Sequence, residues 1–210
     1  MKKMKKRTKV IFIIFTVCVL FLLLYGILYA VNQHLVRQRQ KPDELNTENY
    51  RFYMPDWEQN IFEDEDYTAL DRTIYYTNGA ETFPLEKAGS EQNGALFFID
   101  YFDALTHGDS ETLNRLYTDA YIEQQGPFAP FTMQRIYSAN VNYRGTAEID
   151  GLYGQAELFA LSYCIMRNDG TFRRDIESDA SRTQLIYLVQ TEDGYKIHQV
   201  DYYKNRSSDS

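Results

Sequence analysis

Cysteine is nearly absent from this chain, and histidine, tryptophan and proline are scarce. The 210 residues include two cysteines, three histidines, one tryptophan and five prolines. Cys18 lies inside a long apolar run, which leaves Cys164 without a partner in the rest of the chain. An intrachain disulfide framework is therefore excluded. We expect Cys164 to be a small buried apolar side chain rather than a reactive thiol.

Motifs that hold metals, phosphates or activated nucleophiles are also missing. No His-x-x-x-His, Cys-x-x-Cys or Gly-x-Ser-x-Gly pattern occurs, and there is no glycine-rich phosphate loop. The acidic run Asp64-Glu65-Asp66 lacks the glycine and the distal glutamate of a calcium loop, so we expect a solvated turn there. The sequence therefore predicts no metal site, no cofactor and no catalytic motif.

Acidic residues are absent from the first 31 residues, so the chain has a basic amino-terminal part and an acidic remainder. Residues 1–9 form a basic tail with six of the 22 basic residues, and residues 10–31 carry no charge. From residue 32 onward the net charge is −14. A body this acidic repels nucleic acid and anionic lipid, so we expect neither as a partner of its surface.

The uncharged run at residues 10–31 is long enough to cross a membrane. A helix of 22 residues, at about 1.5 Å per residue, spans the roughly 30 Å hydrocarbon layer. The alternative is a cleaved secretory signal, whose apolar part is normally about 7 to 15 residues and ends at a small-x-small site; Leu28-Tyr29-Ala30 fits that site poorly. Basic residues are more frequent before the run than after it. We therefore predict a single-pass protein of the cell membrane, with a cytoplasmic amino terminus, an extracytoplasmic domain, and the lipid bilayer as the partner of the run.

A polar stalk and an aromatic-rich arm are expected after the membrane span. Residues 32–49 are polar and nearly free of aromatic side chains, which is typical of a linker. Residues 50–93 are rich in aromatic side chains and contain the only tryptophan, Trp57. We expect residues 50–70 to form an arm that packs on the folded domain.

Two amphipathic helices are predicted around the segment FFIDYFDALTHGDSETLNRLYTDAYI, residues 97–122. Apolar residues recur at helical spacing in the first helix: Ala95, Phe98, Ile99, Phe102 and Leu105. Gly108 is expected to end this helix, and Asp109 or Ser110 to cap a second one that ends at Gly126-Pro127. Asp100 and Asp103 turn away from the apolar stripe, and His107 comes one residue before the glycine stop, so we expect all three to be surface or capping groups rather than catalytic ones.

The remaining chain is predicted to form strands separated by turns. Asn78-Gly79 indicates a hairpin over residues 73–85, and Asn168-Asp169-Gly170 and Glu192-Asp193-Gly194 indicate two further hairpin turns. A short helix or turn is expected at residues 132–137, and strands are expected at residues 139–149, 155–167, 181–191 and 195–203. Helices followed by antiparallel strands indicate an α+β fold.

The order of these elements resembles the nuclear transport factor 2-like (NTF2-like) superfold. The segments that carry the resemblance are FFIDYFDALTHGD, SETLNRLYTDAY and YKIHQVDYY. It covers residues 94–203 and leaves residues 204–210 as a tail expected to be disordered. The resemblance implies a cone, in which helices pack on a curved antiparallel sheet around a cavity. Members include isomerases, dehydratases, ligand-binding modules and membrane-anchored subunits of secretion and conjugation machines, so the fold does not choose the function.

A small-molecule lyase or isomerase is the alternative function that the resemblance implies. Such an enzyme needs Asp, Tyr or His side chains in a dry cavity to move a proton. The chain offers Tyr101, Asp103, His107, Tyr117, Tyr187, His198 and Asp201. The residues expected to line the cavity are Tyr101, Tyr117, Tyr187 and His198. No catalytic motif of the superfold matches residue by residue, so we predict no catalytic residue.

A binding or assembly module requires less of the sequence. Eighteen tyrosines and 13 phenylalanines exceed what one core of this size must bury, and tyrosine supplies contact area while tolerating water. Adjacent strand residues point to opposite faces, so one of each pair should face outward as a contact surface. The two pairs are Tyr75 with Tyr76 and Tyr202 with Tyr203. The alternative is that they pack the arm on the domain. We therefore expect a non-catalytic module that binds a protein or an envelope polymer, as a subunit of a cell-envelope, secretion or conjugation machine.

Overall fold

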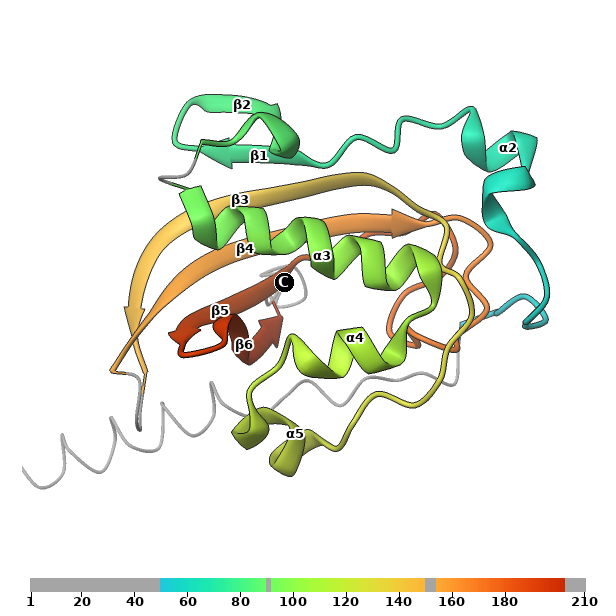
Figure 1. Cartoon of the computed structure of the whole chain (residues 1–210). Helices are drawn as coiled ribbons and strands as arrows, with labels where there is room; N and C mark the ends of the chain where they lie inside the picture. Colours follow the sequence, from blue (N-terminus) through green and yellow to red (C-terminus); the bar gives the residue numbers. More distant parts are fainter. Residues whose placement is uncertain (1–49, 90–91, 150–153, 203–210) are drawn as a thin grey trace, which may run out of the picture. The chain divides into compact units, whose positions relative to one another are not determined.

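The computed structural model describes residues 50–89, 92–149 and 154–202 (Figure 1). The predicted basic tail, the membrane span at residues 10–31 and the stalk lie outside these residues, and so do Tyr203 and the carboxy-terminal tail. Within the described ranges, every helix is too short or too polar to cross a lipid bilayer.

A six-stranded curved sheet forms the body of the described chain. Its strands lie in the order β2-β1-β3-β4-β5-β6, and all neighbours are antiparallel except β1 and β3, which are parallel. Their bounds are Tyr75–Asn78 (β1), Glu81–Pro84 (β2), Ile136–Glu148 (β3), Gln155–Ile165 (β4), Gln184–Thr191 (β5) and Gly194–Tyr202 (β6). The α+β class predicted from the sequence is confirmed.

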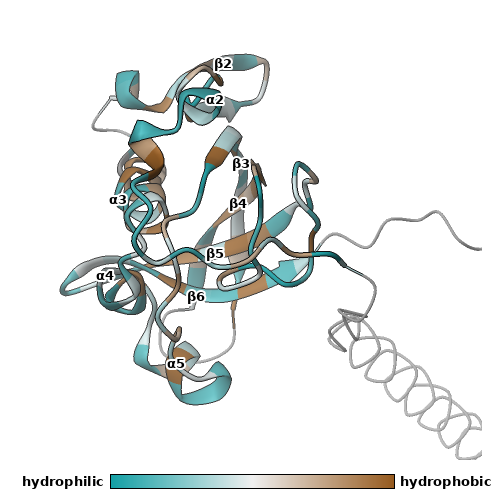
Figure 2. Ribbon diagram, turned by 90° about the vertical axis from the view of Figure 1, so that its right-hand side faces the viewer, coloured by the Kyte–Doolittle hydropathy of each residue, from teal (hydrophilic) through white to brown (hydrophobic). Residues whose placement is uncertain are grey.

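Helix α3 (Asn93–His107) crosses one face of this sheet, and α4 (Ser110–Arg115) follows it (Figures 1 and 2). The predicted carboxy-terminal stop is confirmed, because Gly108 has φ 67° and its N–H donates to Ala104 and Leu105 carbonyls. A Cβ at Gly108 would stand 2.9 Å from the Phe131 carbonyl oxygen, so a side chain does not fit there. The Asp109 cap is confirmed as well, since its carboxylate accepts a hydrogen bond from the Thr112 N–H.

The single second helix predicted from the sequence is wrong, because the chain forms two short helices instead. After α4 the chain turns, and α5 (Asp119–Gln125) begins with Thr118 as its cap. Between the helices, the Thr118 N–H donates to the Ile197 carbonyl and the Ile197 N–H donates to the Leu116 carbonyl. Pairing with the edge of β6 therefore breaks a segment whose apolar periodicity alone is helical.

The buried face of α3 is wider than predicted, and it is rotated about the helix axis relative to the predicted apolar stripe. Phe98 and Phe102 are buried as expected, but Ile99 is 39% exposed. Tyr101 occupies the face in its place and is 1% exposed. Helix α4 lies beside α3 on the same face of the sheet (Figure 2), so α3 is covered from two directions, and the buried arc includes Tyr101 but not Ile99.

The turn predictions are confirmed in two places and wrong at Asn168-Asp169-Gly170, and the segment before β3 forms a turn rather than a helix. Asn78 pairs with Glu81 and Thr191 pairs with Gly194, so both predicted hairpins form at these points. Asn168-Asp169-Gly170 makes no tight hairpin and begins instead a long loop, residues 166–183, between β4 and β5. Residues 132–135 form no helix, and β3 already begins at Ile136; the Ile136 N–H donates to the Gln134 carbonyl at 2.9 Å, a tight turn just before the strand. The cause is a contact with a segment distant in the sequence, because the Gln134 N–H donates to the Leu105 carbonyl and ties this segment to the end of α3.

Candidate functional site

The arm, residues 50–70, is fixed to the body at two points. At the first point, the ring of Phe52 lies against Gly170, where a Cβ would stand 2.8 Å from the ring. The Tyr53 N–H donates to the Asn168 carbonyl at 3.0 Å. Asn168 is itself fully buried, and its amide donates to the carbonyls of Arg173 and Ile176 at 2.9 Å each. The arm therefore begins on a well-ordered loop.

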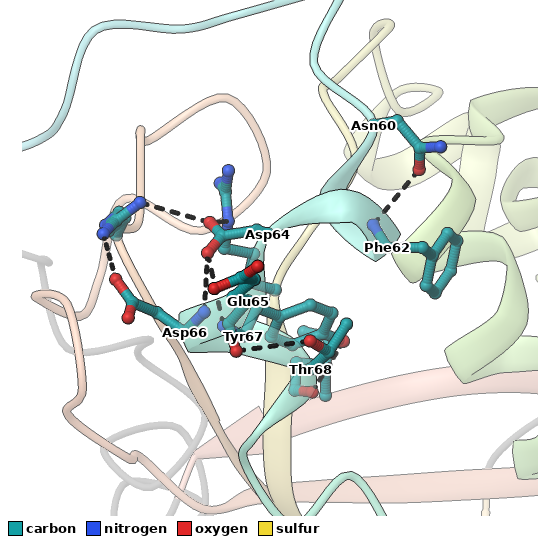
Figure 3. Close-up of polar contacts among 10 residues, drawn as sticks. Asn60, Phe62, Asp64, Glu65, Asp66, Tyr67 and Thr68 are labelled. Atoms are coloured by element: carbon teal, nitrogen blue, oxygen red, sulfur yellow. Dashed lines mark hydrogen bonds and ion pairs between the residues drawn. The ribbon is translucent and has the colours of Figure 1, made fainter.

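The second attachment is a buried carboxylate between two arginines (Figure 3). Asp64 precedes the short helix α2 (Glu65–Thr68), which its side chain caps. It accepts hydrogen bonds from Arg135 Nε at 3.0 Å and Arg167 Nη1 at 3.1 Å, and its side chain is only 7% exposed. Arg167 Nη2 also binds Asp66 at 2.9 Å. The prediction of a solvated acidic turn is wrong for Asp64, because its carboxylate is buried and paired. The local sequence did not indicate this, since both arginines come from distant parts of the chain.

Apolar burial reinforces this attachment. Ile61, in the 3-10 helix η2 (Ile61–Glu63), and Tyr67 are each 1% exposed. The Tyr67 hydroxyl donates to the Ile136 carbonyl at 3.0 Å, so its polar end is also satisfied. The predicted packing of the arm on the domain is confirmed at both ends.

The environment of Asp64 also fixes its charge. Burial of the carboxylate raises its pKa, but the Tyr67 N–H and the guanidinium groups of Arg135 and Arg167 outweigh burial, so the pKa lies below its ordinary value. Asp64 is therefore ionised at neutral pH. In this charged state its ion pairs with the two arginines attach the arm most strongly.

Between the two attachments lies an exposed loop, residues 53–60, with large apolar side chains directed to solvent. Tyr53 is 56% exposed, Met54 89% and Trp57 61%. Single exposed apolar residues are ordinary, but aromatic and methionine side chains gathered on one fixed segment are typical of a contact surface. The sequence indicated the arm correctly but did not distinguish its packed aromatic residues from its exposed ones.

A small hollow lies under the exposed loop. Its volume is about 80 Å³, and its wall includes Tyr53, Met54 and Asp56 from the loop together with Arg135, Arg167 and Asp169 from the body. A water molecule occupies about 30 Å³ of liquid, whereas sites for drug-sized ligands are about 300 to 1,000 Å³. This hollow has room for the end of one side chain and not for a metabolite.

Of the four residues predicted to line a cavity, Tyr101 and Tyr117 come together in the core, whereas Tyr187 and His198 lie elsewhere. Tyr101 and Tyr117 are 1% and 4% exposed and lie within the core, where burial raises the pKa of both hydroxyls well above the ordinary value. Tyr187 and His198 are partly exposed, and each lies beside a fully buried strand residue that points to the core. By strand alternation they face the opposite side of the sheet.

Aromatic rings pack closely in the interior around the two buried tyrosines. Ring centroids of Tyr101 and Phe102 lie 5.5 Å apart, and those of Tyr117 and Tyr121 lie 4.6 Å apart. Next to them is a buried ion pair that the sequence did not indicate, since Arg173 binds Asp175 through two contacts of 2.5 Å. The same guanidinium donates to the Tyr163 hydroxyl at 3.1 Å.

The predicted contact tyrosines have mixed environments. Tyr76 is 2% exposed, whereas Tyr75 is partly exposed and donates to Asp71 Oδ2 at 3.2 Å, so this pair does point to opposite sides. Tyr202 lies beneath the guanidinium of Arg182, 4.4 Å from its ring centroid. The buried Arg173 guanidinium lies 5.9 Å from the same ring, so Tyr202 packs against two arginines.

The aspartate and histidine side chains singled out in the sequence lie at or near the surface of the described chain. Asp103 and His107 are both exposed, with 3.2 Å between their side chains, and Asp100 is exposed too, as predicted. Beside His198, Thr118 Oγ1 lies 3.2 Å from the ring and caps α5, while burial lowers the pKa of the histidine. Asp100, Asp103 and His107 are therefore open to solvent rather than enclosed in a dry cavity.

Two remaining features offer no reactive centre. A second, open hollow of about 580 Å³ lies between the start of α5 and the β5–β6 turn, and its charged residues are Asp119, Glu192, Asp193 and Lys196. Cys164 is partly buried, and burial raises the pKa of its thiol, which lowers its reactivity. Among the described residues, no group of three or more His, Cys, Asp or Glu side chains is arranged to hold a metal ion.

No family model, no curated protein and no solved structure matches this chain.

Asp64→Asn is expected to loosen the arm. The neutral amide leaves Arg135 and Arg167 without their shared anion, so the Tyr53 N–H should exchange with solvent about tenfold faster, equivalent to about 1.4 kcal/mol of local opening free energy. In the unmodified chain the same loosening should appear at acid pH. Because the folded-state pKa of Asp64 is lowered, its stabilising effect is present above about pH 4 and is lost as the pH falls through that pKa.

The measurement is hydrogen exchange by NMR, with each rate divided by the intrinsic rate at the same pH. Asp66→Asn is the matched control, because Asp66 is 71% exposed and pairs only with Arg167 among the described residues. It should change the exchange of Tyr53 little. Equal protection of Tyr53 in the Asp64→Asn and unmodified chains would contradict the role given to Asp64.

Proposed function

We propose that this domain is a non-catalytic binding or assembly module held at a membrane, and that the exposed loop is its binding surface. The observation that carries the proposal is the exposure of Tyr53, Met54 and Trp57 on a backbone attached at both ends. A fixed backbone loses little conformational entropy when it binds, and aromatic side chains supply much of the energy at protein contacts. Both properties favour a docking surface.

We also propose the NTF2-like cone as the fold of residues 94–203. The long helix α3 on a curved sheet, followed by strands β3 to β6, supports this assignment. The close ring packing around Tyr101 and Tyr117 favours a filled interior over a substrate cavity. A lyase or isomerase is accordingly the less favoured function, because it needs an accessible acid or base inside the cone.

The proposed location is the outer side of a cell membrane, with residues 10–31 as the anchor and residues 32–49 as the stalk. The supporting observation is the uncharged run of 22 residues preceded by six basic residues. Protease added to intact cells or spheroplasts should remove the acidic domain and leave a small amino-terminal fragment in the membrane. A domain that stays intact until the membrane is disrupted would contradict this orientation.

The binding role is tested by replacing the three exposed apolar residues together, as Tyr53→Ser, Met54→Ser and Trp57→Ser. The unmodified full-length chain, extracted with mild detergent and run on a native gel, should migrate in an assembly larger than itself. The triple variant should migrate as the free chain, although its free energy of unfolding should change by less than about 1 kcal/mol because these side chains are exposed. Ile99→Ser is the control, since Ile99 is an exposed apolar residue on another element. Co-migration of the triple variant with the unmodified assembly would contradict the proposed surface.

A further inference from the structure

We propose that the exposed loop binds a protein segment whose apolar centre is surrounded by lysine and arginine. This inference rests on the proposed binding function and specifies the chemistry of the partner. It is supported by the charge of the loop, by the size and charge of the hollow beneath it, and by the poor fit of other binding partners.

The first feature is the acidic surrounding of the apolar side chains. Residues 50–66 contain six acidic residues and one arginine, a net charge of −5. Asp64 is buried and paired with Arg135 and Arg167, but the other five acidic residues are exposed: Asp56, Glu58, Glu63, Glu65 and Asp66. An apolar centre with an acidic rim favours a partner with a basic rim, because opposite charges raise the association rate. The same rim repels acidic partner surfaces.

The second feature is the hollow of about 80 Å³ under the loop. Arg135 Nε and Arg167 pair with Asp64 and Asp66, whereas Arg135 Nη2 is buried without a hydrogen-bond partner among the described residues. Asp56 and Asp169 add two further carboxylates to the wall. With Asp64 and Asp66 counted beside the wall, four carboxylates stand against two guanidinium groups, so the balance of charge around the hollow is negative. It suits the end of one apolar or cationic side chain, and such a pocket beside exposed aromatic residues is the usual setting of an interface hot spot.

The acidic charge of the loop and the small volume of the hollow also disfavour other binding partners. A second copy would bring an identical acidic rim against this one, and an anionic bilayer would be repelled in the same way. A small molecule of metabolite size exceeds the hollow. A protein segment with an apolar centre and basic flanks can contact the exposed apolar side chains, pair with the acidic rim and place one side chain in the hollow.

The experiment uses the full-length chain in the cells that make it, with the photoreactive residue p-benzoylphenylalanine at position 54 or, in a separate variant, at position 57. Position 146 is the control, because Thr146 is exposed on β3, far from the arm in the sequence. After irradiation, each cross-linked peptide is identified by mass spectrometry. The expected adducts at positions 54 and 57 join another protein, and the joined segment has a net positive charge.

A second variant tests the rim. Glu58→Lys with Glu65→Lys reverses two exposed charges and leaves the Asp64 ion pairs in place. It should lower the adduct yield at position 54 about tenfold, because like charges now face each other. Glu148→Lys with Glu81→Lys, which changes the net charge equally at exposed sites on β3 and β2, should leave the yield unchanged.

The outcomes separate this inference from the proposed function. Adducts to a neutral or acidic protein segment, or to a second copy, overturn the basic partner but leave a binding module. Adducts to lipid, or to residues 32–49 of the same chain, also overturn it and assign the loop to the membrane or the stalk. No adduct at positions 54 and 57 above the level at position 146 overturns both this inference and the proposed binding surface.

Discussion

Arg173→Met is expected to lower the free energy of unfolding by about 3 to 5 kcal/mol, because it leaves the carboxylate of Asp175 buried without a partner. Both side chains are 5% exposed and meet through two contacts of 2.5 Å. Burial lowers the pKa of Arg173, but Tyr163 and Asp175 outweigh it and raise the pKa above its ordinary value, so the arginine is charged. The variant also removes a donor from the Tyr163 hydroxyl.

Urea unfolding of the detergent-solubilised full-length chain, followed by circular dichroism, measures this cost. The double variant Arg173→Met with Asp175→Leu is the informative control, since it removes both charges and retains apolar volume. It should recover most of the lost stability, because replacing both members of a buried pair is far less costly than removing one. A single variant that costs less than about 1 kcal/mol, or a double variant that costs the sum of the two single changes, would contradict a coupled buried pair.

Phe98→Ala and Phe102→Ala should each cost about 3 to 5 kcal/mol, a large part of the stability of a typical domain. The rings are 0% and 2% exposed. Phe98 lies 5.1 Å from Phe159 and Phe102 lies 5.5 Å from Tyr163, between ring centroids and in edge contact, so truncation opens a cavity between α3 and β4.

Ile99→Ala is the matched control for both changes. The sequence placed Ile99 on the same apolar stripe, but the side chain is 39% exposed. Its truncation should therefore cost less than about 1 kcal/mol in the same unfolding measurement. If Ile99→Ala proved as costly as Phe98→Ala, the orientation of α3 on the sheet would be wrong.

Local signals predicted much of the fold. The stop at Gly108, the cap at Asp109 and the hairpins at Asn78 and Glu192 depend on residues close in the sequence, and all four form as expected. Apolar spacing placed Phe98 and Phe102 correctly for the same reason.

The errors occur where a distant segment overrides a local preference. Pairing with β6 at Ile197 breaks the expected second helix at Leu116–Thr118. Arg135 and Arg167 convert an acidic turn at Asp64 into a buried attachment. Composition indicated that residues 50–70 pack on the domain, but a single sequence does not show that Trp57 is left outside, because the same residue types serve cores and interfaces.

Oxidative footprinting of Met54 and Trp57 in intact cells tests most directly whether the exposed loop is covered by a partner. In the purified chain both side chains should be oxidised readily, since they are 89% and 61% exposed. In cells the proposed partner should cover them and lower their oxidation about tenfold, as expected for residues at the centre of an interface. Tyr187, partly exposed on β5, is the reference and should be modified equally in both samples. Equal oxidation of Met54 and Trp57 in cells and in the purified chain would contradict a binding surface on the arm.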